Sequence, residues 1–266
     1  MSSIINAVLV NADYLILIVF RVGGLVFTSP IFGRVNLPPL VKICLITAVG
    51  YMFYLVFPQT VEIQYSSLIG FVLICASELL LGIALAFVTN IFFSLTAFIA
   101  GQLIDMQLGY GIVNVYDIQN NTQIPMMGNV LNIMLLIVFF SVDGHLELIR
   151  IIHFTIDRMP IGTLIISPEI GLVAAEVFIR AFMLGVMMAL PIVASGLTLE
   201  ICFGMLMRAV PQIHMFVVGI PMKMLIGLVV FAFTLPVFIG FSDRIFSELI
   251  SGVEKMFATF LEVSTA

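Results

Sequence analysis

The stretch GQLIDMQLGYGIVNVYDIQNNTQIP, residues 101–125, interrupts a chain that is otherwise largely apolar. It contains three glycines, two carboxylates (Asp105 and Asp117) and a run of amides and hydroxyls, but no Lys or Arg. Irregular backbone leaves polar groups unpaired, so at membrane depth it survives only where protein buries it or where it lines a wet cavity. Two interpretations are open: a pathway or plug inside the protein, or a solvated loop between two spans.

The composition indicates an integral membrane protein. Hydrophobic residues make up 62% of the 266 residues, charged residues make up 9%, and the mean hydropathy is +1.26. These values lie outside the usual range of soluble domains. At roughly 20 residues per span, the length allows about six to eight spanning or half-spanning helices. A net charge of −5 without any basic run argues against nucleic acid as a partner.

The apolar runs on either side of this stretch predict helices. Membrane-type runs cover 14–28, 40–57, 68–93, 127–142, 170–207 and 213–240, and an amphipathic segment covers 146–160. The last two membrane-type runs flank the polar turn RAVPQIH and predict a helical hairpin. Residues 242–262 predict an amphipathic helix that lies on the membrane surface or docks on a partner. Docking is favoured because the polar face is not rich in cations.

Charged residues inside the apolar runs need compensation, because each would cost about 2.5 to 3.5 kcal/mol at the centre of a spanning helix. Glu78 has no cation within two helical turns along the sequence, so we expect its partner to come from elsewhere in the fold or from another subunit. A proton-relay role for Glu78 is the alternative interpretation. The charges concerned are Arg21, Glu78, Arg180, Glu200, Arg208 and Lys223.

The sequence contains none of the catalytic templates GxSxG, HExxH, GxxxxGK[ST] and SxxK. The three histidines, His145, His153 and His214, form no pair at i, i+3 or i, i+4, which argues against a metal site built from one chain. Gly109-Tyr110-Gly111 shares three letters with the potassium filter but lacks its threonine-valine lead-in. We therefore expect no enzymatic activity, no metal and no cofactor.

Several stretches, in this order, resemble one protein family. They are RVGGLVFTSPIFGRVNLPPLVKI from Arg21, GQLIDMQLGYGIVNVYD from Gly101, DGH at 143–145, MPIG at 159–162 and LMRAVPQIHMFVVGIPMK at 206–223. Together they resemble FliR, the export-gate protein of flagellar type III secretion, whose injectisome counterpart is SctT. The similarity runs from Arg21 to Glu248, and the ordered set is more specific than any single motif.

The resemblance implies an all-α, membrane-associated fold of tilted, broken helical hairpins. In this family view, residues 1–169 form a FliP-like helical part that contains the central loop 101–125. Residues 170–241 form a FliQ-like hairpin, and residues 242–266 form the amphipathic C-terminal helix. The residues that match FliQ features are Pro191, Pro211-Gln212 and Pro221-Met222-Lys223.

The resemblance also implies an assembly. A single copy of the chain joins several FliP-like and FliQ-like subunits in a helical cone, with FlhB-like and FlhA-like export components as further partners and unfolded proteins as substrates. The expected location is the bacterial inner membrane within the flagellar basal body, with segments partly lifted to the periplasmic side. The residues expected at buried-charge or subunit-contact positions are Arg21, Glu78, Glu200, Arg208, Gln212 and Lys223.

In that family, the loop that matches Met106 to Asp117 hangs in the pore as a plug. The residues carried over to the plug are Met106, Gln107, Leu108, Gly109, Tyr110, Gly111, Ile112, Val113, Asn114, Tyr116 and Asp117. The family usually has Asp-Pro at the end of this loop, whereas Ile118 follows Asp117 here. The C-terminal boundary of the plug is therefore less well defined than its start.

The expected function is that of a FliR-like subunit of the bacterial type III export gate, which forms part of the channel for unfolded substrates and does no covalent chemistry. Chain length and overall pattern favour the flagellum over the injectisome. One alternative is a secondary transporter with Glu78 and Asp105 as coupling carboxylates, but this predicts inverted repeats that the sequence does not show. A membrane-embedded enzyme would require a nucleophile or metal constellation that is missing from the sequence.

Overall fold

The computed structural model of the protein describes residues 12–33, 38–57, 67–109, 115–117, 122–162, 169–209 and 219–264. The chain divides into two compact units, each assembled from separate segments. Unit 1 comprises Met1–Asn90, Asp143–Val177 and Leu249–Ala266, and unit 2 comprises Ile91–Val142 and Phe178–Glu248. These units group residues by contact. The division expected at residues 169 and 241 rests on relatedness to other proteins and stays a prediction.

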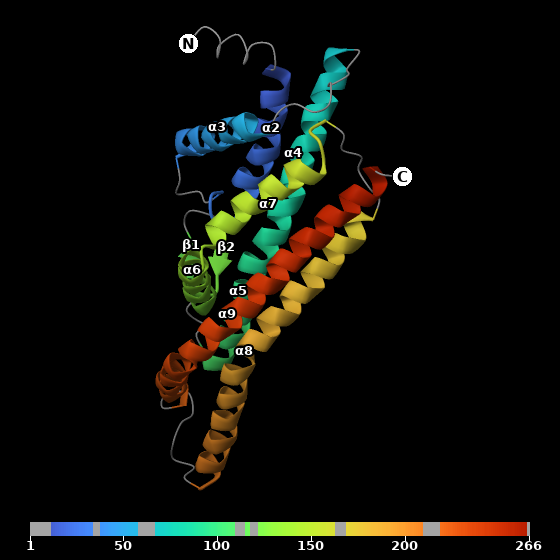
Figure 1. The fold of residues 1–266 in the computed structure, drawn as a ribbon. Coiled ribbons are helices and arrows are strands. Elements are labelled where there is room, and N and C mark those ends of the chain that lie inside the picture. Colours follow the sequence, from blue (N-terminus) through green and yellow to red (C-terminus); the bar gives the residue numbers. More distant parts are fainter. Residues whose placement is uncertain are drawn as a thin grey trace. The chain divides into compact units, whose positions relative to one another are not determined.

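Unit 1 is organised by the crossing of α2 (Ala12–Thr28) and α4 (Leu68–Asn90), which lie against each other in Figure 1. Each helix carries a glycine at the crossing. A Cβ on Gly24 would lie 2.4 Å from a backbone oxygen of α4, and a Cβ on Gly82 would lie 2.2 Å from a backbone oxygen of α2. Small residues allow two helix backbones to approach this closely.

Two further helices contribute to the described helical core of unit 1. α3 (Pro39–Val56) begins with proline at its first position, where the fixed φ suits a helix and the missing N–H would have no partner. α7 (Gly144–Arg158) has the amphipathic pattern that the sequence predicted, with Glu147 and Arg150 paired outside its apolar face. The buried apolar side chains of this core include Leu17, Ile18, Val22, Ile46, Phe53, Leu148 and Ile152.

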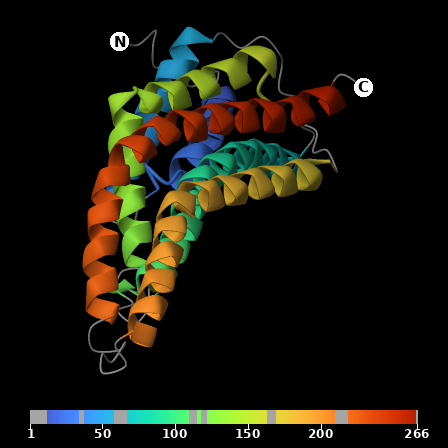
Figure 2. The same cartoon turned by 90° about the horizontal axis from the view of Figure 1, so that it is seen from below.

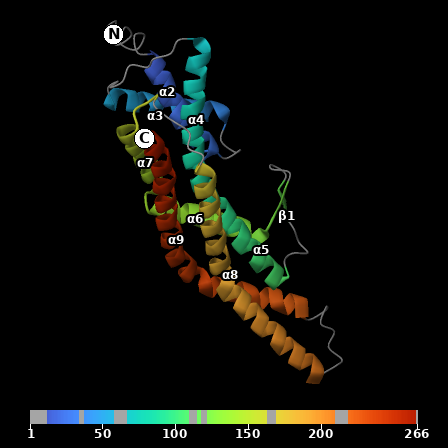
Figure 3. The same ribbon diagram turned by 90° about the vertical axis from the view of Figure 1, so that its right-hand side faces the viewer.

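Unit 2 begins where α4 continues without a break into the π-helix η1 (Ile91–Leu95) and then into α5 (Thr96–Leu108). α6 (Met126–Ser141) lies beside α5 (Figure 3). The two helices meet at a glycine pair, since a Cβ on Gly101 would lie 2.1 Å from both Cα and N of Gly128. This crossing brings together the two helices that flank the central loop.

The central loop is more regular than the sequence predicted. Residues 101–108, expected in the irregular stretch, belong to α5. Farther along, β1 (Val115–Asp117) and β2 (Thr122–Ile124) form a short antiparallel hairpin. The expectation of irregular backbone is therefore wrong for these residues, because helix and ladder bonds pair the backbone groups that an irregular segment would leave unpaired.

The C-terminal part of the chain consists of two long helices, α8 (Ile170–Ala209) and α9 (Ile220–Ser264). Within unit 2, the end of α8 and the start of α9 lie next to each other in Figure 2 but diverge in Figure 3, and Lys223 of α9 pairs with Glu200 of α8. The FliQ-like hairpin stays a prediction. The segment predicted as an amphipathic helix from residue 242 is helical, and α9 reaches it without a break through buried Ser242, whose hydroxyl donates to the Phe238 carbonyl at 2.9 Å. The predicted amphipathic face does exist, and its buried residues are Ile245, Leu249, Val253, Met256 and Phe260.

Four helical stretches in the described ranges are long and apolar enough to cross a membrane, or five if α6 and α7 are counted as one broken span. The four are Pro39–Val56, Leu68–Leu108, Ile170–Ala209 and Pro221–Leu261. The predicted all-α membrane fold is confirmed. The β1–β2 hairpin is a small addition to it.

Candidate functional site at the base of the central loop

Glu78 of α4 is fully buried and pairs with Arg21 of α2, which is 1% exposed. The guanidinium donates from Nε to Oε2 at 2.6 Å and from Nη2 to Oε1 at 3.1 Å, in a two-pronged contact. Such bidentate, charge-assisted hydrogen bonds are the strongest that side chains form. The expectation that Glu78 finds a cation elsewhere in the fold is confirmed, and the cation comes from the same chain.

The pair also binds the end of α7 and the turn that follows it. Nη1 of Arg21 donates to the backbone oxygens of Thr155 at 3.1 Å and Met159 at 3.2 Å, and so places a cation at the negative end of the helix dipole. The N–H of Gly162, which has a φ of 88°, donates to Oε1 of Glu78 at 2.7 Å. Three separate segments of unit 1 therefore depend on one ion pair.

Asp105 is the second buried acid on the same continuous helical run, and it is 4% exposed. Its carboxylate accepts the N–H of Met127, with N···O distances of 3.3 and 3.4 Å. Met127 lies in the first turn of α6, whose N-cap residue, Pro125, makes no side-chain cap hydrogen bond. Asp105 thus caps α6 from a neighbouring helix and places negative charge at the positive end of that helix.

The last turn of α5 is held against two further helices of unit 2. Leu108 is fully buried, and a Cβ on Gly227 of α9 would lie 2.2 Å from its Cδ2. Gln107 lies against α8, where a Cβ on Gly196 would lie 2.3 Å from its Cγ. Within the described residues, Nε2 of Gln107 is buried without a hydrogen-bond partner. Together with Asp105, these residues fix the base from which the central loop departs.

The helix ends at Gly109, which has a φ of 80° in the left-handed region that favours glycine. Met106, on the other side of the last turn, is 66% exposed. Among the other residues predicted for the plug, Tyr116 and Asp117 lie in the backbone of β1. The remaining ones, Tyr110, Gly111, Ile112, Val113 and Asn114, fall outside the described residues, so their predicted role stays a prediction.

The other predicted buried charges lie in less enclosed surroundings. Lys223 of α9 pairs with Glu200 of α8, whose side chain is 42% exposed. Arg180 pairs with Glu248 at 3.0 Å. Arg208 is exposed in this chain because the last turn of α8 has no described segment packed over it, and Gln212 falls outside the described residues. Of the charged residues predicted to be buried, Arg21 and Glu78 are therefore the two that the described structure buries fully.

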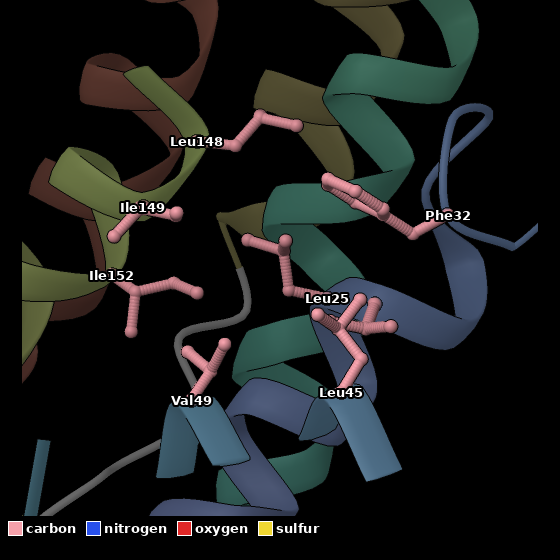
Figure 4. A pocket seen from close by; sticks show the side chains of 8 residues that line it. Leu25, Phe32, Leu45, Val49, Leu148, Ile149 and Ile152 are labelled. Atoms are coloured by element: carbon pink, nitrogen blue, oxygen red, sulfur yellow. The ribbon is translucent and has the colours of Figure 1, made fainter. Parts of the chain in front are cut away.

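The described residues provide no metal-binding group of three or more His, Cys, Asp or Glu side chains. A small pocket in unit 1 opens between α2, α3 and α7 (Figure 4). Its lining offers no polar side chain for catalysis, since it consists of Leu25, Val26, Phe32, Leu45, Val49, Leu148, Ile149 and Ile152. The polar groups that could matter for function are thus the helix-end contacts of Arg21, Glu78 and Asp105.

Sequence reasoning gave Asp105 a role only in the transporter alternative and did not identify Gly128, Gly196 or Gly227 as contact positions. A signal for Asp105 was present: Gly101, Ile104, Asp105 and Leu108 recur at helical spacing and are all buried. No comparable signal exists for the glycines of α8 and α9, because their neighbours lie far away in sequence.

The chain is similar in sequence to known proteins over most of its length. The family described as "Bacterial export proteins, family 1" matches residues 13–249. The chain is 28% identical over 229 residues to the flagellar biosynthetic protein FliR of Escherichia coli (strain K12), covering 86% of this chain and 87% of that protein. It is 27% identical over 256 residues to the FliR of Bacillus subtilis (strain 168), covering 91% of this chain and 94% of that protein.

Proposed function

We infer the function from the premise that this chain belongs to family 1 of the bacterial export proteins. The relation to FliR that the ordered motifs predicted is thereby confirmed. We propose that the protein is a subunit of the bacterial flagellar type III export gate, embedded in the inner membrane at the basal body. It forms part of the channel for unfolded flagellar substrates and does no covalent chemistry.

The proposal assigns the central loop to the channel as its plug. The observation that carries it is the anchored base: α5 ends at the left-handed Gly109 after a buried turn that contacts three other helices of unit 2. A plug must keep a fixed attachment while its tip moves, and a rigid stem with a glycine at its end provides that combination. The glycines allow the loop to swing aside when a substrate passes.

Companion subunits cover the apolar surface that this chain leaves open. The start of α9 exposes a row of large side chains, and the end of α8 does the same. Under the proposal, FliP-like and FliQ-like subunits pack on these faces, and FlhB-like and FlhA-like components join the assembly. The exposed residues on the two helices include Ile201, Met205, Leu225, Leu228, Val229 and Phe233, and Phe233 is 80% exposed.

The geometry does not favour the transporter alternative. A coupling carboxylate must bind and release a proton or an ion, yet both oxygens of Glu78 are engaged by Arg21 and one also accepts the Gly162 N–H. These hydrogen bonds hold three segments of unit 1 together, which supports a structural role for Glu78. Asp105 alone would then remain as a coupling group.

Deletion of residues 107–116 in the assembled gate tests the proposed plug. We expect a raised ion leak across the membrane, because the deletion removes both the loop and its anchored turn. Single-channel recording of the purified gate in a planar bilayer, together with co-purification of the companion subunits, provides the measurement.

The matched control replaces Gly171, a position at the start of α8 with no described atom within 4 Å of an added Cβ, by alanine. It should leave both assembly and leak unchanged. An unchanged leak in an intact gate that carries the deletion would overturn the plug role.

A further inference from the structure

We propose that Gly196 of α8 and Gly227 of α9 are positioning residues for the loop base, because they hold the last turn of α5 between the two arms of the C-terminal hairpin. The inference rests on the proposed export function. It adds that the C-terminal hairpin determines where the central loop leaves α5. All residues that carry it belong to unit 2 and lie in the described ranges.

The contact at Gly227 is the tighter of the two. Leu108 is 0% exposed, and a Cβ on Gly227 would lie 2.2 Å from Cδ2, 3.1 Å from Cδ1 and 3.1 Å from Cγ of this leucine. The whole branched end of the side chain thus lies on the glycine surface. Since a packed interior resists even one added methyl group, an alanine at this position must displace Leu108.

The contact at Gly196 involves Gln107, the next residue along the same turn. A Cβ on Gly196 would lie 2.3 Å from Cγ, 2.8 Å from Nε2 and 3.0 Å from Cδ of the glutamine. The stem of the side chain lies flat against the helix backbone, where only a residue without a side chain leaves room. Adjacent residues of α5 therefore contact different arms of the hairpin.

Other glycines on these two helices differ in this respect: a Cβ on Gly185 of α8 would also meet α5, at 3.0 Å from the Thr96 backbone oxygen, whereas two others have no close neighbour. Gly204 on α8 and Gly240 on α9 have no described atom within 4 Å of an added Cβ. Glycine weakens a helix interior by about 1 kcal/mol relative to alanine, so a glycine with a close neighbour has a steric reason to be there. Gly204 and Gly240 also provide matched controls, because they share the helices but lack the contact.

A cross-link tests the contact at Gly196 directly. The variant carries Gln107→Cys and Gly196→Cys, with Cys44, Cys75 and Cys202 replaced by serine, and is expressed with the companion subunits. The new Cβ at position 196 would lie 2.3 Å from Cγ of Gln107, which places the two Cβ atoms within disulfide reach. We expect the disulfide in the resting gate after mild oxidation, and none with the control pair Gln107→Cys and Gly204→Cys. A resting, assembled gate that forms no 107–196 disulfide would overturn the proposal.

An alanine series tests the contact at Gly227 by a second measurement. Gly227→Ala should raise the ion leak about two- to tenfold, the factor expected when a side chain moves roughly 30° from its preferred rotamer. Gly240→Ala should leave the leak unchanged. Adding Leu108→Ala to Gly227→Ala makes room for the new methyl group and should bring the leak back toward its original value. Equal effects of Gly227→Ala and Gly240→Ala would refute the positioning role.

The two experiments also separate this inference from the plug. If the 107–196 disulfide forms but deletion of 107–116 leaves the leak unchanged, the hairpin contact stands and the plug role fails. If the deletion raises the leak but no disulfide forms, the plug role stands and the positioning role fails.

Discussion

The two buried acids, Glu78 and Asp105, occupy opposite kinds of site on one continuous helical run. Each has a glycine one turn away on the same helix, Gly82 for Glu78 and Gly101 for Asp105, and each glycine forms a close helix crossing. Glu78 pairs with an arginine and accepts a backbone N–H. Asp105 makes no ion pair with any described residue and caps a helix instead.

Because of this difference, we expect the Arg21–Glu78 pair to contribute more to the free energy of unfolding than the Asp105 contact does. Removing one partner of a buried ion pair leaves a charge with nothing to compensate it. Removing a helix cap leaves a polar N–H that a water molecule or another acceptor can satisfy. We therefore assign the Arg21–Glu78 centre to the structural integrity of unit 1, and the Asp105 contact to the weaker attachment of the start of α6.

The largest predicted effect comes from Arg21→Met, which leaves the buried Glu78 side chain without its ion-pair partner. We expect a loss of about 3 to 5 kcal/mol in the free energy of unfolding, the usual result of breaking a buried pair. Thermal unfolding of the purified gate in detergent measures it. The double variant Arg21→Met with Glu78→Leu should recover part of the loss, and not all of it, because the Gly162 N–H still lacks its acceptor. A single variant as stable as the parent would contradict the structural role.

The next largest effect comes from filling the crossings. Gly82→Ala and Gly101→Ala each place a methyl group against backbone, which cannot turn aside as a side chain can, so each should destabilise the protein by about 1 to 3 kcal/mol. Gly171→Ala, with no described atom within 4 Å of the new Cβ, is the control and should be neutral or slightly stabilising. Limited proteolysis should show faster cleavage in the first two variants, and equal cleavage rates in all three would rule out close crossings.

A smaller effect is expected at Asp105. Asp105→Ala removes the cap of α6 and should cost about 0.5 to 2 kcal/mol, whereas Asp105→Asn keeps an oxygen for the Met127 N–H and should cost less. The comparison is with Glu78→Gln, which leaves Arg21 as an unpaired buried cation and should resemble Arg21→Met. Thermal midpoints measure the loss of stability in each variant. Similar losses for Asp105→Asn and Glu78→Gln would contradict the proposed difference between the two sites.

The smallest effect is expected for the Lys223–Glu200 pair, whose carboxylate side is 42% exposed. Lys223→Ala should change the free energy of unfolding of the chain by at most about 1 kcal/mol, because solvent screens such pairs. High salt should have the same effect on the parent protein as the substitution. A loss as large as that of Arg21→Met would show that the companion subunits bury this pair in the assembly.

The sequence predicted the helical membrane fold and the requirement that Glu78 be compensated, because both follow from local composition. It did not identify Arg21 as the partner of Glu78, since the two residues are 57 positions apart and no spacing rule connects them. The boundary between α5 and the loop was missed for a different reason. Gln102, Asp105 and Gln107 are polar residues of the kind found in loops. The helix is indicated instead by Gly101, Ile104 and Leu108, which recur at helical spacing and are buried.

The β1–β2 hairpin was also missed, although Asn120 and Asn121 are typical turn residues between two segments of strand-forming character. A short ladder inside a polar stretch gives little hydrophobic alternation, so the usual signal is weak. The glycine contacts of the loop base depend on helices brought together by tertiary packing, and only a three-dimensional structure reveals them.

The arrangement of the Arg21–Glu78 centre has a consequence for biosynthesis. Its last contact along the sequence, the N–H of Gly162, is synthesised after both α2 and α4. Until then, a nascent chain would carry a charged pair whose surroundings are incomplete, and the helix segment after Leu249, which also belongs to unit 1, comes later still. The Arg21–Glu78 centre is therefore complete only after residue 162 has been synthesised, so chains truncated before this residue lack one of its contacts.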